Sequence, residues 1–236
     1  MHAPHEGGVI TRSTDIEPTL AEVLGELRAL DEPRIRTVNE RHGDDHGVNL
    51  TKLRAMAKRL RTQPELSSAL WATGDTAARL LALLICRPKA FGAAELDAMV
   101  READRPKVHD WFVNYVAKKS AHAEELRTSW MNDPAAGVAA AGWALTSDRV
   151  VKRPDDLDLA ALLDIIEAEM ATAPPRVQWA MNTCLATIGI ERPECRSRAI
   201  DIGKRLRVLE DYPTSPGCTS PYAPVWIAEI VRRREG

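Results

Sequence analysis

The sequence predicts an all-α protein made of HEAT-like two-helix repeats that form a right-handed solenoid. Apolar residues recur at three- and four-residue spacing along most of the chain, which is the pattern of amphipathic helices. Proline, glycine and aspartate separate these stretches into pairs. No stretch alternates apolar and polar residues in the way a half-buried strand does. We therefore expect a single helical domain over residues 16–236, preceded by a mobile tail at residues 1–15.

The expected helices follow one another in order. A first helix begins near residue 16 and ends at Pro33, and a second runs from Asn49, a favourable N-cap, to Arg61. Helix pairs are then expected at residues 65–72 and 75–86, 94–103 and 107–118, 121–131 and 135–150, and 159–172 and 176–190. Their first helices start 27 to 38 residues apart, as in HEAT-type repeats.

One segment departs from this pattern. Residues 211–224, DYPTSPGCTSPYAP, contain four prolines and no helical periodicity. Because proline and glycine favour turns and resist helix formation, we expect a rigid, turn-rich loop there. A last helix is expected from Val225 to Arg234.

Composition limits the possible functions. The chain of 236 residues is 28% charged and 44% hydrophobic, with a net charge of -2, which is ordinary for a globular protein. This charge excludes a strongly basic nucleic-acid binder, although a local basic face can still exist. No apolar run approaches the roughly 20 residues of a membrane span, and the first residues lack a secretory signal. We expect a cytoplasmic protein with no membrane partner.

The candidate metal ligands are few. The four cysteines include no closely spaced pair, which favours reduced thiols over a zinc site. His42 and His46 flank two aspartates and would suit a divalent ion on a helix. Gly43 and Gly47 instead favour a polar loop that leads to the Asn49 cap. We predict neither a metal site nor a cofactor.

A basic helix is the clearest candidate for nucleic-acid binding. The stretch from Asn49 to Arg61 carries five positive charges and no negative ones; they are Lys52, Arg54, Lys58, Arg59 and Arg61. Arg54, Lys58 and Arg61 line one stripe and could follow a row of phosphates, or they could form an ordinary solvated face. Trp111 and Trp179 have polar neighbours and could line a groove in which a base stacks.

Several of these stretches resemble successive helices of the AlkD-type DNA alkylation-repair proteins. They are HGVNLTKLRAMAKRL (46–60), ELSSALWATGDTAARLLALLI (65–85), GVAAAGWAL (137–145) and RVQWAMNTCLATIG (176–189). The shared order extends over roughly residues 38 to 209. Because members of that family are HEAT-like solenoids that excise N3- and N7-alkylated purines, the resemblance implies a concave cleft that binds duplex DNA.

The catalytic positions implied by the resemblance are altered. In active relatives one helix carries a Trp and, four residues later, an Asp, both facing the cleft. Here Asp110 stands where the Trp is expected and Asn114 where the Asp is expected. Shifting the alignment by one residue matches Trp111 but puts Tyr115 at the acid position. Asp110, Trp111 and Asn114 are therefore only weak catalytic candidates.

The resemblance also implies a clamp that is missing. The family's paired arginines correspond to Ala139 and Ala140, and a second cleft Trp corresponds to Thr183. A carboxylate about 4 Å from a developing positive charge contributes about 4 kcal/mol, which is about a thousandfold in rate. We therefore expect a DNA-associating protein with weak or absent base excision. One alternative is a helical-repeat scaffold that binds a protein partner, and another is a glycosylase with its site rebuilt on Asp110 and Trp111.

Overall fold

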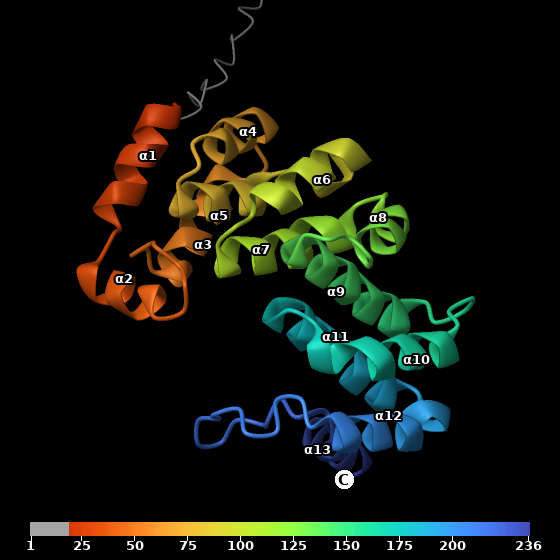
Figure 1. Cartoon of the computed structure of the whole chain (residues 1–236). Coiled ribbons are helices and arrows are strands. Elements are labelled where there is room, and N and C mark those ends of the chain that lie inside the picture. Colours follow the sequence, from red (N-terminus) through yellow and green to blue (C-terminus); the bar gives the residue numbers. More distant parts are fainter. Residues whose placement is uncertain (1–18) are drawn as a thin grey trace, which may run out of the picture.

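The computed structural model describes residues 19–236, so the tail expected at residues 1–15 lies outside the described part. The described chain is 72% helical, with 13 α-helices and no strands; its single β-bridge joins Asp31 and Val48. The helices follow a C-shaped arc around a hollow (Figure 1). The all-α prediction is therefore confirmed. None of the described helices is long and apolar enough to cross a membrane.

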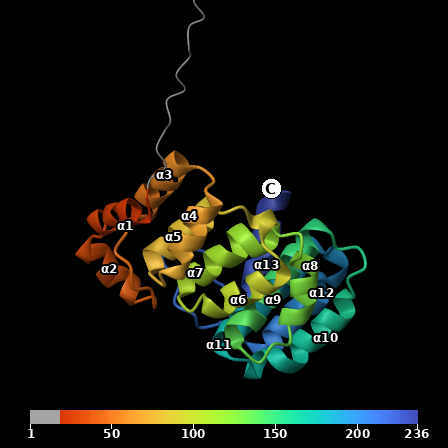
Figure 2. The same cartoon turned by 90° about the horizontal axis from the view of Figure 1, so that it is seen from above.

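The first half of the arc contains seven α-helices. They are α1 (Leu20–Ala29), α2 (Pro33–Glu40), α3 (Leu50–Leu60), α4 (Pro64–Ala72), α5 (Thr76–Ile85), α6 (Ala93–Glu102) and α7 (Pro106–Trp111). Seen from above, α1 and α2 stand at one end of the arc (Figure 2). The second half contains α8 (Ala123–Trp130), α9 (Ala136–Lys152), α10 (Leu159–Glu169), α11 (Pro175–Glu191), α12 (Pro193–Leu206) and α13 (Ala223–Glu235).

The helices form two layers. The inner layer is a succession of contacts from α3 to α5, α7, α9, α11 and α13, in which α9 meets the continuation of α7. The partner helices α4, α6, α8, α10 and α12 cover this layer from outside, as the contacts of α4 with α5 and of α8 with α9 illustrate. Each inner helix therefore follows its outer partner in sequence, which is the layout of two-helix repeats.

Two helical features differ from the prediction. Pro33 was expected only to end the first helix, but it also begins α2. Proline fits the first helical position because its missing N–H has no helical partner there. The helix expected at residues 107–118 is broken after Trp111: a π-helical turn, η2 (Phe112–Val116), is followed by a 3-10 turn, η3 (Ala117–Lys119). The Ala117 N–H bonds to the Phe112 carbonyl, five residues earlier.

Helix α9 belongs to both hydrophobic cores. Val138 and Leu145 pack into the core that extends from α1 to α8, while Ala139 and Trp143 pack into the core formed with α10 to α13. Gly142 allows the close approach of α8, because a Cβ there would lie 2.5 Å from the Met131 backbone nitrogen. This helix consequently joins the two halves of the arc.

We expect Gly142→Ala to lower the free energy of unfolding by about 1–3 kcal/mol, because the added methyl group would push α8 away from α9. Gly25→Ala in α1 is the matched control, since a Cβ there meets only the end of Arg28, at 4.0 Å. That replacement should stabilise the protein by about 0.5–1 kcal/mol through helix propensity. Urea unfolding followed by circular dichroism measures the free energy of unfolding of each variant. Equal changes in the two variants would show that the contact between α8 and α9 at Gly142 has no special steric requirement.

Candidate nucleic-acid interface

Helix α3 carries the basic stripe and is held in place by its cap and its apolar face. The Asn49 Oδ1 accepts hydrogen bonds from the backbone N–H groups of Thr51 and Lys52. Leu53, Met56, Ala57 and Leu60 are buried against the core. Because these four side chains occupy one side of the helix, its cations are directed away from the core.

The five cations of α3 fall into two groups. Lys52 pairs with Glu32 at 2.8 Å, and Arg59 pairs with Glu26 of α1. Arg54, Lys58 and Arg61 form no ion pair within residues 19–236. These three are the residues that the spacing had placed on one stripe. A carboxylate partner neutralises part of the positive potential around a cation and so weakens its attraction for a phosphate. Arg54, Lys58 and Arg61 are therefore the stronger candidates for DNA contacts.

A cluster of aromatic rings and cations joins α3 to the broken end of α7. The Arg54 guanidinium lies 4.8 Å from the Trp111 ring centroid, and its Nη2 is 3.5 Å from the Tyr115 hydroxyl. Trp111 and Tyr115 meet edge to face at 5.3 Å, with the Lys119 Nζ 5.5 Å from the Tyr115 ring. Trp111 is only 6% exposed. The expectation that it lines a base-stacking groove is therefore wrong, because Arg54 and Tyr115 cover its ring.

The position where the resemblance implies an acid holds an amide bonded to a cation. The Asn114 Nδ2 donates to the Asp110 carbonyl at 2.8 Å, and the Lys118 Nζ donates to the Asn114 Oδ1 at 2.8 Å. Burial lowers the pKa of the Lys118 ammonium, and the carboxylates of Asp148 and Asp110 only partly oppose this effect. The Asp110 carboxylate is exposed and lies 4.0 Å from the His109 Nδ1. Asp110, Asn114 and Lys118 therefore share one face, with the ammonium beside Asn114.

The expected clamp positions are filled by packing. Ala139 and Ala140 are buried, and the Thr183 hydroxyl donates to the Trp179 carbonyl at 2.9 Å. A different arginine approaches this region: a Cβ on Gly137 of α9 would lie 3.3 Å from the Arg176 Nη1 of α11. The sequence analysis did not select Arg176. Its position three residues before Trp179, on the same side of a predicted helix, could have indicated a cation beside that ring.

Trp179 is the exposed tryptophan that the sequence had proposed for a groove. Its side chain is 41% exposed and contacts Tyr212, from the proline-rich loop, edge to face with the ring centroids 5.0 Å apart.

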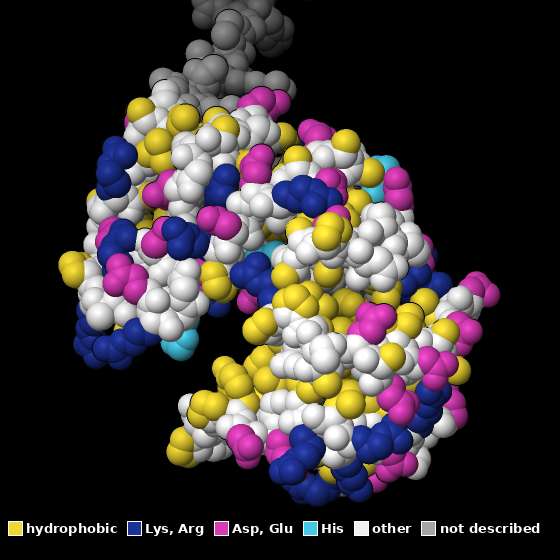
Figure 3. Space-filling view, in the orientation of Figure 1, with side chains coloured by type: hydrophobic (Ala, Val, Ile, Leu, Met, Phe, Trp, Pro, Cys, Tyr) yellow, Lys and Arg dark blue, Asp and Glu magenta, His cyan; other side chains and the backbone are white. Residues whose placement is uncertain are grey.

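In Figure 3 the hollow of the arc has basic side chains on its upper wall and apolar side chains along its lower wall. The proline-rich loop between α12 and α13 extends beneath that hollow (Figure 1).

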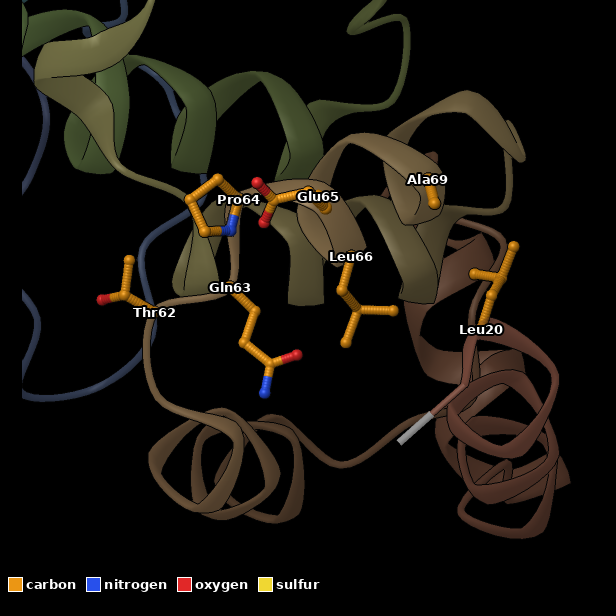
Figure 4. A pocket seen from close by; sticks show the side chains of 7 residues that line it. All are labelled: Leu20, Thr62, Gln63, Pro64, Glu65, Leu66 and Ala69. Atoms are coloured by element: carbon orange, nitrogen blue, oxygen red, sulfur yellow. The ribbon is translucent and has the colours of Figure 1, made fainter. Parts of the chain in front are cut away.

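A separate pocket lies near the N-terminal end of the arc. It has a volume of about 370 Å³ and is lined by Leu20, Thr62, Gln63, Pro64, Glu65, Leu66 and Ala69, between α1 and α4 (Figure 4). Of these lining residues only Glu65 is titratable. This pocket therefore lacks the converging polar groups of a catalytic site.

Comparison with known proteins shows the family of the chain. Residues 23–227 match the family model described as DNA alkylation repair enzyme. The chain belongs to this family. A solved structure, described as belonging to a new family of proteins related to the HEAT-like repeat DNA glycosylases with affinity for branched DNA structures, has the same fold. It aligns with a TM-score of 0.76 and 22% identity over 91% of this chain and 94% of its own. No curated protein matches the chain.

In this member of the DNA alkylation repair enzyme family, the loop that contains His42 and His46, which the sequence analysis considered for metal binding, fixes the start of α7. The Asp44 Oδ1 accepts a hydrogen bond from the Lys107 backbone N–H at 2.9 Å, and the Asp45 carboxylate pairs with Arg105 at 2.9 Å. No group of three or more ligand-type residues is assembled within residues 19–236. The loop therefore positions the helix that leads to Asn114.

His46, in the same loop, is buried, and the Asn39 Nδ2 donates to its carbonyl at 2.8 Å. Burial lowers the pKa of the His46 imidazole, more than the carboxylates of Asp44 and Asp45 raise it. The folded protein therefore favours the neutral ring, whereas the unfolded chain protonates near pH 6.5.

We expect the free energy of unfolding to be highest above about pH 6.5 and to fall as the pH decreases from 7 to 5.5, because the unfolded state then binds the extra proton. Urea unfolding across this range measures the effect. His46→Gln should flatten the dependence, and an unchanged slope in that variant would show that His46 is not its source. Carboxylates with lowered pKa values, such as Asp97 and Glu124, stay charged throughout this pH range and therefore do not contribute to the expected slope.

Proposed function

We propose that this DNA alkylation repair family protein binds DNA along the concave side of the arc and releases alkylated bases slowly or not at all. The observation that carries the proposal is the arrangement around Asn114. Its amide is fixed between the Asp110 carbonyl and the Lys118 ammonium, at 2.8 Å from each. The amide and the ammonium can both donate hydrogen bonds to DNA, and the ammonium adds positive charge. Neither group supplies the carboxylate that base excision would need.

The DNA-binding part is supported by charge. Arg54, Lys58 and Arg61 are exposed on α3 without ion-pair partners in the described chain, and Lys118 and Lys119 lie at the end of the same aromatic cluster. Lysine and arginine side chains that contact phosphates release condensed counterions, which favours binding without reading sequence. The structural neighbour is described as having affinity for branched DNA structures, which agrees with a DNA-binding role.

The loss of excision follows from electrostatics. Cleavage of the glycosidic bond leaves positive charge on the sugar, and a carboxylate about 4 Å away would stabilise it by about 4 kcal/mol. An amide dipole supplies only part of this stabilisation. The neighbouring ammonium of Lys118 repels the developing charge, so the local field opposes the reaction.

We expect release of 7-methylguanine or 3-methyladenine from duplex DNA by the unaltered protein to be far slower than in active relatives. Asn114→Asp should accelerate release, by at most about a thousandfold, because Lys118 neutralises part of the new charge. Asn114→Ala is the control and should leave the slow rate unchanged. Single-turnover release of free base is the measurement. Rapid release by the unaltered protein that Asp110→Ala abolishes would show that the acid has moved to Asp110.

We expect binding to a fluorescent duplex to be weak, tolerant of sequence and dependent on salt. Replacing both Arg54 and Lys58 with Ala should reduce the log–log salt slope by about two units, since each phosphate contact contributes about 0.9. Replacing both Lys52 and Arg59 with Ala is the matched control: the same charge is removed, but from side chains already paired with Glu32 and Glu26.

Fluorescence anisotropy at several salt concentrations provides the slopes. Equal slopes for the two double variants would contradict the assignment of the contacts to Arg54 and Lys58. Absence of any duplex binding at low salt would contradict the DNA-binding proposal and favour a helical-repeat scaffold for a protein partner.

A further inference from the structure

The inner face of α11 and the proline-rich loop together expose an aromatic pair. Trp179 is 41% and Tyr212 47% exposed, and they are the aromatic residues among the exposed large apolar side chains of the described chain. Their ring centroids are 5.0 Å apart, with the ring planes at 68°. In this edge-to-face arrangement the edge of one ring lies against one face of the other, so each ring keeps at least one face that its partner does not cover.

The loop that carries Tyr212 is fixed near both of its ends. Asn182 is buried in α11, and its Nδ2 donates to the Pro221 carbonyl at 2.8 Å. Pro224 fits against Gly203 of α12, where a Cβ would lie 2.7 Å from the proline ring. At the start of the loop, the Tyr212 N–H bonds to the Leu209 carbonyl. Tyr212 itself is held by this turn and by its ring contact with Trp179.

A cation stands one turn before the aromatic pair. Arg176 forms no ion pair with any residue in the range 19–236, and its guanidinium lies near Gly137 on the neighbouring inner helix. Residues three apart on a helix lie on the same side, so Arg176 and Trp179 border one surface. An uncompensated cation beside exposed ring faces suits a ligand with both a flat π-system and a negative charge, which a nucleotide has.

We propose that Trp179 and Tyr212 form a stacking platform for an unpaired base of bound DNA, with Arg176 at the adjoining phosphate. This inference rests on the proposed DNA-binding function and specifies its preferred substrate. Bases inside an intact duplex have both faces covered by neighbours, whereas a bulged or displaced base has a free face. The platform therefore favours DNA that contains unpaired bases over the same DNA fully paired.

The test compares two duplexes that differ only in a three-nucleotide bulge containing 2-aminopurine. Stacking on an aromatic side chain is worth about 1–3 kcal/mol per base, so the protein should bind the bulged duplex about 5- to 150-fold more tightly. The 2-aminopurine fluorescence should be quenched on binding. Trp179→Ala and Tyr212→Ala should each reduce the preference and the quenching, while affinity for the paired duplex remains unchanged.

Two control variants accompany the test. Trp179→Phe keeps a π-face and should retain most of the preference. Val225→Ala removes an exposed apolar side chain that has no π-face and should change nothing. Binding of both duplexes with equal affinity, unaffected by Trp179→Ala, would overturn the platform while leaving the proposed DNA binding intact. Failure to bind either duplex at low salt would overturn both proposals.

Discussion

The close crossing of α8 and α9 at Gly142 is the constraint on which the rest of the arc depends. The crossing leaves no room for a Cβ against the Met131 backbone. Helix α9 can then bury one face against the first core and the opposite face against the second. Its width separates α7, which leads to Asn114, from α11, which carries Arg176 and Trp179. The spacing of the candidate binding groups therefore follows from the packing of α9 between the two halves of the arc.

The same packing favours small apolar residues at the two positions where the resemblance implies an arginine clamp. Ala139 is part of the second core and Ala140 is also buried, so an arginine at either position would bring an unpaired charge into an apolar interior, at a cost of several kcal/mol. Arg176, from the next inner helix, brings a guanidinium to the start of α9 by a different route. The cationic character of the region thus comes from α11 and α3.

Local chemistry allowed much of the fold to be predicted. Asn49 and Asp75 cap α3 and α5 as their residue types suggest, and the proline-rich segment does form a loop. The helical periodicity gave no sign of the π-turn after Trp111. The burial of Trp111 was not predictable either, because it involves contacts with residues distant in the sequence, such as Arg54. Tyr212 was overlooked for the same reason: only the folded chain brings it beside Trp179. At Asn114, by contrast, the family resemblance together with the residue type indicated the missing acid, and the structure adds the partner Lys118.

Because these groups lie apart, DNA affinity and the rate of base excision can change independently within one fold. The proposed contacts of Arg54 or Arg176 with phosphates, and of Trp179 with a base, would be made equally before and during bond cleavage. Such uniform interactions increase affinity without accelerating the chemical step. A carboxylate at position 114 would act on the charge that develops only during cleavage. Under the proposed function, an amide bonded to Lys118 in place of that carboxylate lowers the rate selectively, so that a chain of this family would retain DNA binding while losing base excision.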